Sequence, residues 1–450
     1  MSNQHISNDQ DSSGHLFARK LDGSLLEAVK AEGVWIEDAA GKRYLDASGG
    51  PILANVGHGR EEIARAVHDQ ILKCDYVHGT MFTTSVVEEL ARKLASHAPE
   101  GLDRFYFLST GSEAVETAIK LARQIQIDSG RPQRFKLISR WKSYHGLTLG
   151  ALSAAGRTTF RAPFAPMLTD VLHIPPPYCL RCPYGLTYPT CNLRCAAALD
   201  EAIQNLGEET VSAFLAETVS GATLAAYPPP PGYLQRIREI CDHHGVLLIL
   251  DEVMSGLGRT GRWFACQHYD VVPDIMTLAK GLSGGAAALS AVAVKSKYLE
   301  IIKKGTGNFI HGGTYSHHAA SAAAGLATIN ILEREKLVER VDEYGKILGE
   351  KLKSRLADLP QVADIRGIGF MWGIEIVKDK ATLEPFPRRE KVTEHLWDAL
   401  FKNGVITYKS TGLAGTDGDA LMVAPPFIIE EKEMDMAADS IRKAIRETLG

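Results

Sequence analysis

Two charged residues, Asp251 and Lys280, each stand at the end of an apolar run in this sequence. The runs cover residues 245–250 and 274–279, and glycine or charge bounds each of them. Such runs predict strands that are buried on both faces of a parallel sheet. Because open α/β sheets bind ligands at the carboxyl ends of their strands, we expect both side chains to face one crevice. A carboxylate and an amine placed together suit a cofactor that needs one partner at each end.

Lys280 and Glu217 each allow a chemical and a structural interpretation. A lysine that is desolvated at a strand end has a lowered pKa and becomes a nucleophile toward carbonyl groups. A single lysine is nevertheless more often a surface residue that reaches solvent. Glu217 ends the apolar run 213–217, where it could hydrogen-bond within the crevice or simply be solvated. The neighbouring motifs are needed to choose between these interpretations.

The segment Ser109-Thr-Gly-Ser-Glu113 follows an apolar run and precedes a helical pattern. Backbone N–H groups at a helix N-terminus, with small hydroxyl side chains beside them, form an anion site. The same residues match an ordinary capping box from Thr110 to Glu113, which needs no ligand. Tyr144 follows the next expected strand, where its ring could stack on a planar group or pack against the core.

From residue 104 onward, apolar runs alternate with helical stretches, an order that predicts a βαβ organisation. The expected strands cover residues 105–108, 135–139, 213–217, 245–253, 274–281 and 286–294. Helices are expected between them at residues 113–126 and 233–244. The sequence therefore predicts an α/β fold, with a mostly parallel central sheet and helices on both faces.

The two ends of the chain depart from this rhythm. A short helix from Leu25 and then a hairpin to residue 46 are expected first, and paired strands at 363–376 with a closing helix at 430–448 come last. At 450 residues the chain exceeds one hydrophobic core. We therefore expect a flexible tail, a large domain, and a small α+β domain built from both termini. Their boundaries are residues 1–20 for the tail, 76–335 for the large domain, and 21–75 with 336–450 for the small domain.

Bulk composition excludes several classes of partner. The net charge is −4, with 45% hydrophobic and 23% charged residues, so neither nucleic acid nor an anionic membrane is an expected partner. No apolar run is long enough to span a bilayer. Residues 1–14 are polar and resemble no secretory signal, and we expect a cytoplasmic protein.

Four of the seven cysteines cluster in the sequence, at Cys179, Cys182, Cys191 and Cys195. In a reducing compartment such a cluster raises the question of a zinc site. The second pair lacks the two-residue spacing of common structural zinc sites, and the flanking residues 175–189 are rich in proline, tyrosine and glycine. A cysteine-rich surface loop without metal is therefore the expectation.

Five motifs, taken in order, resemble those of the class III aminotransferases, which are fold-type I pyridoxal 5′-phosphate enzymes. The motifs are Ser-Thr-Gly-Ser-Glu-Ala at 109–114, Tyr-His-Gly at 144–146, Asp-Glu-Val-Met-Ser-Gly-Leu-Gly-Arg-Thr-Gly at 251–261, Ala-Lys-Gly-Leu at 279–282 and Gly-Gly-Thr-Tyr at 312–315. The resemblance runs from about Leu25 to the C-terminus. It implies the same mostly parallel sheet flanked by helices, with a small α+β domain from both termini.

The resemblance implies three catalytic residues. Lys280 would form the internal aldimine with the cofactor and then move a proton between the substrate carbon and the cofactor C4′. Asp251 would pair with the pyridine nitrogen and keep it protonated, which agrees with the effect of a nearby carboxylate on a cation. Glu217 would brace the region around Asp251.

The resemblance also implies the residues that bind the cofactor. Gly111 and Ser112 would hold its phosphate, while Tyr144 and Val253 would pack on opposite faces of its ring. The full set is Gly111, Ser112, Tyr144, His145, Gly146, Glu217, Asp251, Val253, Lys280 and Thr314. Thr314 matches a residue that reaches the phosphate of the neighbouring subunit, so the resemblance implies a homodimer or a dimer of dimers.

Three departures from the family pattern bear on the substrate. Ala222 stands where ornithine- and 4-aminobutyrate-type members have a second glutamate, and Met254 stands where many have glutamine. At both positions the sequence resembles the ω-amino acid and amine:pyruvate transaminases instead. The third is the stretch 412–426, which contains no arginine before its Ala-Pro-Pro, although members usually grip a substrate carboxylate there. Lys409 or an arginine from elsewhere could replace it, but Arg259 and Arg366 lie in motifs with structural roles.

The expected function is therefore transfer of an amino group from an ω-amino acid or amine to a keto acid such as pyruvate. The missing arginine keeps open a related lyase or decarboxylase, of the phospholyase or dialkylglycine decarboxylase type. A cofactor-binding regulator or structural protein that lost its activity is a third hypothesis, which the presence of Lys280 and Asp251 disfavours. The loops 49–54, 76–83 and 409–419 are expected to shape the substrate pocket.

Overall fold

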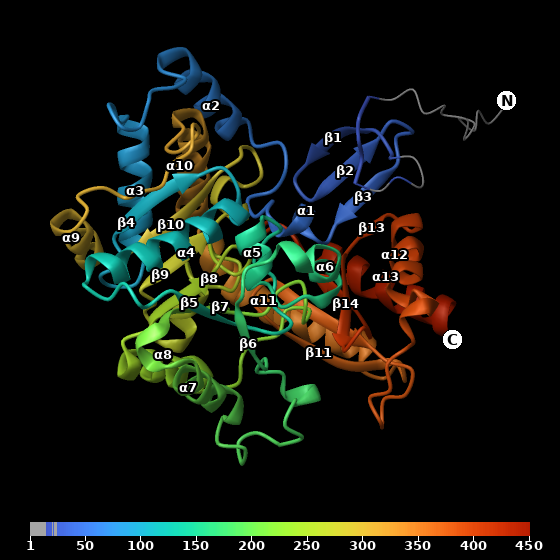
Figure 1. The fold of residues 1–450 in the computed structure, drawn as a ribbon. Helices are drawn as coiled ribbons and strands as arrows, with labels where there is room; N and C mark the ends of the chain where they lie inside the picture. The colour runs from blue at the N-terminus through green and yellow to red at the C-terminus, as the bar shows by residue number, and fades with distance from the viewer. Residues whose placement is uncertain (1–14, 20, 22–24) are drawn as a thin grey trace.

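The computed structural model describes residues 15–19, 21 and 25–450, which form three β-sheets and the helices around them (Figure 1). Most of the predicted tail, residues 1–20, lies outside the described residues. The central sheet has seven strands. Their spatial order is β4 (Arg104–Leu108), β10 (Ser290–Val294), β9 (Ile275–Leu278), β8 (Leu247–Asp251), β7 (Val211–Glu217), β5 (Lys136–Arg140) and β6 (Leu172–Ile174).

The central sheet is mostly parallel, which confirms the predicted fold class. β10 runs antiparallel to both β4 and β9, while β5, β6, β7, β8 and β9 pair in parallel. Asp251 at the end of β8 lies beside Glu217 on β7 and Thr277 on β9. Parallel pairing therefore delivers the ends of these strands to one edge of the sheet.

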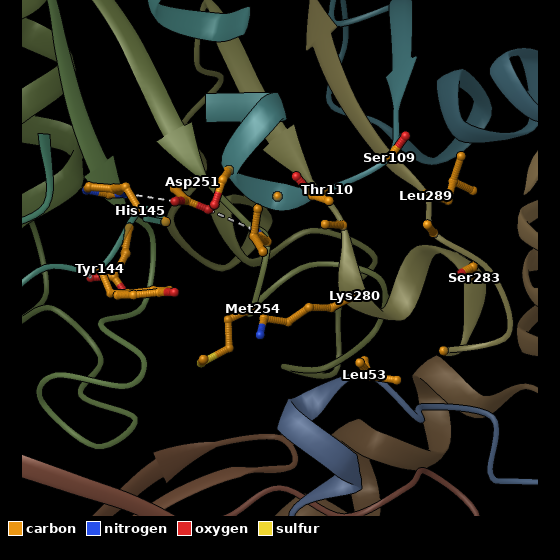
Figure 2. Close-up of a pocket in the computed structure, with 18 of the residues that line it drawn as sticks. Leu53, Ser109, Thr110, Tyr144, His145, Asp251, Met254, Lys280, Ser283 and Leu289 are labelled. Atoms are coloured by element: carbon orange, nitrogen blue, oxygen red, sulfur yellow. Dashed lines mark hydrogen bonds and ion pairs between the residues drawn. The ribbon is translucent and has the colours of Figure 1, made fainter. Parts of the chain in front are cut away.

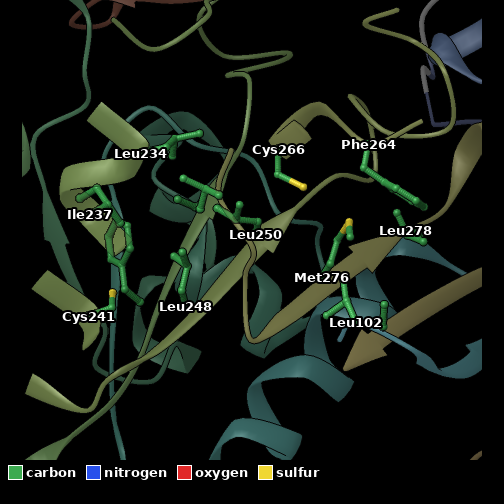
Figure 3. Close-up of a cluster of buried hydrophobic side chains, with 14 of the residues drawn as sticks. Leu102, Leu234, Ile237, Cys241, Leu248, Leu250, Phe264, Cys266, Met276 and Leu278 are labelled. Carbon is green, nitrogen blue, oxygen red and sulfur yellow. The ribbon is translucent and has the colours of Figure 1, made fainter. Parts of the chain in front are cut away.

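The strands of this sheet are buried on both faces, as their continuous apolar runs predict. On β8, Leu248 and Leu250 pack into one apolar cluster with Met276 and Leu278 of β9 (Figure 3). Leu247 and Ile249 enter a second cluster on the opposite face. Since burial of each such side chain stabilises the fold by about 1.5–3 kcal/mol, the two clusters hold the strand ends in place.

Helices cover both faces of the sheet. The first cluster is completed by α3 (Ser85–His97), α7 (Arg194–Leu206) and α8 (Tyr233–His244), and the second by α4 (Gly111–Asp128) and α9 (Ser296–Lys304). The other α-helices are α1 (Gly49–Ile52), α2 (Glu61–Lys73), α5 (Leu149–Ala154), α6 (Thr158–Arg161), α10 (Ala319–Arg334), α11 (Leu337–Leu356), α12 (Val392–Lys402) and α13 (Glu431–Leu449). Among the described residues, none of these helices combines the length and the apolar character needed to cross a membrane.

The two ends of the chain meet in a second sheet, in the order β1 (Ala28–Glu32), β2 (Trp35–Asp38), β3 (Arg43–Asp46) and β13 (Val405–Ile406). β13 pairs in parallel with β3, and Figure 1 shows the blue N-terminal strands beside the red C-terminal elements. A third sheet has the order β11 (Val362–Ile368), β12 (Met371–Ile376), β15 (Asp417–Val423) and β14 (Tyr408–Ala414). The exact domain boundaries stay a prediction.

The helix predicted from Leu25 is wrong. The structure places the strand β1 there, and Glu32 of β1 lies opposite Trp35 of β2. Leucine, alanine, lysine and glutamate favour a helix locally, but pairing with a neighbouring strand overrides that weak preference.

The loop expected at residues 409–419 is also wrong, because β14 and β15 form a hydrogen-bonded hairpin there. Gly412 in β14, Gly415 in the turn and Gly418 in β15 have φ of +84°, +74° and +92°, backbone angles that other residues rarely adopt. The register shifts between Thr411 and Ala414. These glycines therefore belong to a bulged hairpin.

Candidate active site

A cavity of about 460 Å³ opens at the carboxyl ends of the central strands. Nine of the ten residues that the sequence predicts for the cofactor site line it, and the exception is Thr314. In Figure 2, Asp251 and Lys280 enter the cavity from neighbouring strand ends. The expectation that these two side chains face one crevice agrees with their positions.

Lys280 stands just after β9, in the short 3₁₀ turn Lys280–Ser283. Its backbone has φ +47°, in the left-handed region where a residue with a side chain is strained. Asn55 supports this turn by donating from Nδ2 to the carbonyl of Gly281 at 2.9 Å. Burial is the main cause that lowers the pKa of Lys280 to about 8. The charge of Asp251 opposes this shift, and the charge of Arg259 adds to it. The amine is therefore readied to act as a nucleophile near neutral pH.

The reactivity of Lys280 is expected to rise with pH around 8. With its pKa lowered to about 8, roughly one amine in ten is deprotonated at pH 7, against fewer than one in a thousand for an ordinary lysine. The deprotonated amine is the nucleophile, so the labelling rate should climb through pH 8 and level off above about pH 9. Trinitrobenzenesulfonate labelling of the cofactor-free enzyme, followed by peptide mass spectrometry, measures this rate. A midpoint near that of exposed Lys409 would contradict the shift.

Asp251 is held by two hydrogen bonds, one to each carboxylate oxygen. The backbone N–H of Val253 donates to Oδ1 at 3.0 Å, and Nδ1 of His145 lies 2.7 Å from Oδ2. Because an ionised carboxylate only accepts, Nδ1 of His145 must carry the proton. Nε2 of His145 is buried and has no hydrogen-bond partner among the described residues. His145 thus orients the Asp251 carboxylate, a role that sequence reasoning did not give it.

Glu217 lines the cavity, but its side chain contacts loops rather than Asp251. It accepts from the N–H of Gly221 at 3.0 Å and from the N–H of Tyr144 at 3.4 Å. Burial raises its pKa, His145 and the Gly221 N–H oppose that shift, and nearby Asp251 adds to it. Glu217 therefore orders the loop that carries Tyr144, and it reaches Asp251 through strand pairing and through charge.

The N-terminus of α4 forms one wall of the cavity. Thr110 and Glu113 form a capping box, in which the Thr110 hydroxyl accepts from the Glu113 N–H. The N–H groups of Gly111 and Ser112 are among the first four of the helix, which have no partner inside it. A Cβ on Gly111 would stand 3.1 Å from Cγ1 of Val253, so glycine keeps this wall open. The two interpretations of the motif are compatible, because the cap leaves these N–H groups available for an anion.

Sequence reasoning missed part of the wall opposite Asp251. Ser283, Gly285 and Leu289 line the cavity beyond the turn that carries Lys280. The Gly284-Gly285 pair that follows Lys280 so closely was the available signal, because paired glycines mark a tight turn at the site. Leu53 lines the cavity from the C-terminal end of α1, in the segment 49–54 that was expected to be a pocket loop and forms a short helix instead.

Thr314 is exposed and does not line the cavity of its own chain. The nearby Ile310 and Tyr315 are 69% and 63% exposed. The role of Thr314 in a neighbouring subunit stays a prediction.

The candidates for gripping a carboxylate lie apart from this cavity. Lys409 is exposed and points its amine at the Trp397 ring, 4.2 Å from the ring centre. Arg259 is buried and donates to the carbonyls of Phe370 and Pro425 at 3.2 Å and 2.6 Å, a structural role. Ala222 is buried outside the cavity lining, whereas Met254 forms part of it.

Arg366 joins a buried charge cluster instead of the cavity. Nη1 donates to Asp364 at 2.9 Å and to Glu375 at 2.8 Å, while Nη2 donates to the carbonyl of Leu224 at 2.6 Å. Glu375 is fully buried and also accepts from Nε of Arg181 at 2.9 Å. The guanidinium therefore balances a carboxylate that water does not reach.

Replacing Arg366 with methionine is expected to destabilise the protein strongly. Loss of one partner leaves the buried Glu375 carboxylate undercompensated, and such a change costs about 3–5 kcal/mol of unfolding free energy. Denaturation in urea measures it, with Arg355→Met as control. Arg355 forms exposed pairs with Asp435 and Asp439, so its loss should cost under about 1 kcal/mol. Equal losses in the two variants would contradict a buried role for Arg366.

The four clustered cysteines lie around one small cavity of about 20 Å³. All four are free thiols, with Cys179 exposed and Cys195 buried. Burial raises the pKa of the Cys195 thiol to about 11, and the nearby Cys179 and Cys191 add to that shift. Among the described residues, no group of three or more metal-binding side chains is placed to hold a metal ion.

Comparison with known proteins relates the whole chain to one enzyme family. The family model of class III aminotransferases matches residues 16–445. The uncharacterised aminotransferase YodT of Bacillus subtilis is 37% identical over 424 residues, covering 94% of this chain and 95% of YodT. The putrescine–pyruvate aminotransferase of Pseudomonas aeruginosa is 35% identical over 422 residues, covering 93% of this chain and 90% of that enzyme.

Solved structures agree with this assignment. The crystal structure of an (S)-enantioselective omega-transaminase from Thermomicrobium roseum superposes with a TM-score of 0.89 at 38% identity. The match covers 95% of this chain and 93% of that structure. The resemblance inferred from the five motifs is thereby confirmed. The chain belongs to the class III aminotransferases.

Proposed function

We propose that this aminotransferase uses pyridoxal 5′-phosphate to move an amino group from an ω-amino acid or amine to a keto acid such as pyruvate. The observation that carries the proposal is the joint placement of Lys280 and Asp251 in one cavity, beside the N-terminus of α4. An amine of lowered pKa, a buried carboxylate and helix N–H groups suit the aldehyde, pyridine nitrogen and phosphate of this cofactor.

The residues present fit such a cofactor. Gly111 leaves the wall beside α4 open, and a Cβ on Gly146 would stand only 2.3 Å from Oγ of Ser112. Gly146 also has φ +124°, which a residue with a side chain rarely adopts. The unpartnered Nε2 of buried His145 fits a site that is completed by a bound polar group. When bound, pyridoxal phosphate supplies a reactive aldehyde and an electron-accepting ring.

Each residue of the cavity then has a defined task. Lys280 would hold the cofactor and move a proton at the substrate carbon, a task for which its lowered pKa suits it. Asp251, oriented by His145, would stabilise positive charge on the ring nitrogen. Tyr144 and Val253 would pack against the ring of the bound cofactor. The N–H groups of Gly111 and Ser112 would hold the phosphate.

We further propose that the enzyme is a homodimer, or a dimer of dimers, in which Thr314 contributes to the neighbouring phosphate site. Exposed apolar side chains flank Thr314 in the chain, and they mark a surface suited to a partner. The segment that carries Met81 and Phe82, which are 72% and 62% exposed, lies against it, because Gly79 approaches the His317 ring. The exposed apolar side chains on these two segments support the proposal that a partner subunit covers them.

The proposed donor class is supported by the names of similar proteins and by two positions in the sequence. The relative from Pseudomonas aeruginosa is named for putrescine and pyruvate, and several similar structures are named omega-transaminases. At Ala222 and Met254 the sequence resembles the ω-amino acid and amine:pyruvate transaminases. The alternative of a lyase or decarboxylase rested on the arginine-free stretch 412–426, and no observation in the structure adds to it.

A donor and acceptor screen with the purified holoenzyme tests the proposal. Addition of an amine donor alone should shift the absorbance of the bound cofactor from the visible toward the near ultraviolet, and addition of pyruvate should restore it. Failure of every amine and ω-amino acid to cause the shift would contradict transamination. Release of phosphate or carbon dioxide without need of a keto acid would favour the lyase or decarboxylase instead.

A further inference from the structure

A second cavity of about 560 Å³ adjoins the segment that carries Tyr144. Trp141 and Lys142, at the start of this segment, line the second cavity, while Tyr144 lines the first. The other lining residues include Arg157 and Thr411. Two cations and several threonines therefore face this cavity, and none of the described residues that line it is a carboxylate.

Arg157 has hydrogen-bonding capacity that the protein leaves unused. Nη2 donates to Oγ1 of Thr411 on β14 at 3.2 Å, and the guanidinium lies 4.2 Å from the centre of the Phe160 ring. Nε is buried and has no hydrogen-bond partner among the described residues. Because a buried donor without a partner costs free energy, this geometry is that of a site completed by a ligand with acceptor oxygens.

Arg157 also acts electrostatically on Tyr144, which lines the first cavity. Burial raises the pKa of the Tyr144 hydroxyl, and the charges of Arg19 and Arg157 oppose that rise. The pKa of Tyr408 is likewise raised by burial and lowered by Arg157. The guanidinium thus lies within electrostatic reach of the ring proposed to pack on the cofactor.

The other cations near the second cavity are less suitable for binding an anion. Nζ of Lys142 donates to the carbonyl of Gly412 at 2.9 Å. Lys409 faces the Trp397 ring. Arg19 is exposed, and its guanidinium lies 5.9 Å from the centre of the Phe160 ring. Arg157 combines partial burial, a free donor and a place on the cavity wall.

We propose that Arg157 binds the carboxylate of the substrates from this second cavity. The inference rests on the proposed transamination, because a 2-oxo acid acceptor and an ω-amino acid donor both carry a carboxylate. The planar guanidinium presents parallel donors that match the two oxygens of a carboxylate. Thr411 of the β14–β15 hairpin positions Arg157, so the arginine-free stretch 412–426 does not leave the substrate anion without a partner.

The two half-reactions of the holoenzyme separate this role from a structural one. Cofactor absorbance is followed with 1-phenylethylamine, which has no carboxylate, with β-alanine as an ω-amino acid, and with pyruvate. In Arg157→Ala, kcat/KM for a carboxylate substrate should fall about 100-fold, while that for 1-phenylethylamine should change less than about threefold. A loss with pyruvate assigns the acceptor carboxylate and a loss with β-alanine the donor carboxylate, and either supports the proposal.

Two further measurements sharpen the test. Butyrate, which has the carboxylate but no reacting group, should inhibit the wild-type enzyme competitively and Arg157→Ala much more weakly. Arg157→Lys, which keeps the charge but loses the paired donors, should recover part of the lost kcat/KM. Arg19→Ala and Lys409→Ala serve as controls, and both should keep the activity of the wild type with pyruvate.

Equal slowing of the neutral amine and the carboxylate substrates in Arg157→Ala would overturn the proposal, because it would indicate a structural role. A selective loss in Arg19→Ala or Lys409→Ala, with Arg157→Ala unaffected, would overturn it as well. Failure of the transamination proposal is seen separately, as a wild-type enzyme whose cofactor no amine converts.

Discussion

Lys280→Ala is expected to lower turnover by at least ~10⁴-fold, because one side chain supplies both the nucleophile and the proton-transfer group. Lys280 is the lysine that lines the 460 Å³ cavity, and its pKa is lowered to about 8 by burial. The left-handed backbone at this residue directs the side chain from the end of β9. Alanine removes the amine together with the chain that carries it. The initial rate with an amine donor and pyruvate measures the effect.

Covalent labelling provides a second readout for the same variant. After reduction with borohydride, the wild-type peptide that contains Lys280 should carry the mass of the cofactor, and the alanine variant should carry none. Lys295→Ala is a matched control. The amine of Lys295 lies 3.2 Å from the carboxylate of Asp274, just before β9, and Lys295 does not line the cavity. Retention of activity in Lys280→Ala, or loss of the label in Lys295→Ala, would refute the assignment.

Asp251→Asn is expected to lower kcat by about 10²–10⁴-fold with little change in folding, since it removes a charge and keeps the shape. Asp251 accepts from Val253 and from His145, and asparagine can accept at only one of its two side-chain atoms. The neutral amide cannot stabilise a cationic ring nitrogen, so the proton on that nitrogen is lost more readily. Steady-state kinetics and the thermal midpoint together test this.

Asp251→Glu and His145→Gln distinguish charge from orientation. Glutamate keeps the charge on a longer side chain, so it should be less impaired than asparagine if charge dominates. His145→Gln leaves the carboxylate but loosens it, and we expect a loss of about tenfold, of the size seen when a supporting partner is removed. An asparagine variant with normal kcat would refute the role proposed for Asp251.

The parts of the site that could be predicted were those carried by local pattern. The apolar runs before Asp251 and Lys280 had to form buried strands, and parallel pairing brought their ends together. The Gly111 turn needed only a strand before it and a helix after it. In each case the residue type and its immediate neighbours contained the information.

The parts that could not be predicted depend on contacts between distant segments. His145 acts on Asp251 across 106 positions, and Arg157 reaches Thr411 across 254. The strand β1 forms because β2 is beside it, against the helical preference of its own residues. The hairpin at β14–β15 uses glycines whose backbone angles the sequence pattern does not reveal. Contacts with distant segments, and not local propensity, determine the conformation of these parts of the chain.

The parallel pairing of β3 with β13 has a consequence for synthesis on the ribosome. The backbone N–H of Leu45 donates to the carbonyl of Gly404 at 2.8 Å, so the edge of β3 is closed only when nearly the whole chain has been made. At typical elongation rates the nascent chain carries that open edge for on the order of tens of seconds. An unpaired strand edge is a template for association between chains. Yield in the cell should therefore depend on chaperones that shield the N-terminal strands until β13 emerges.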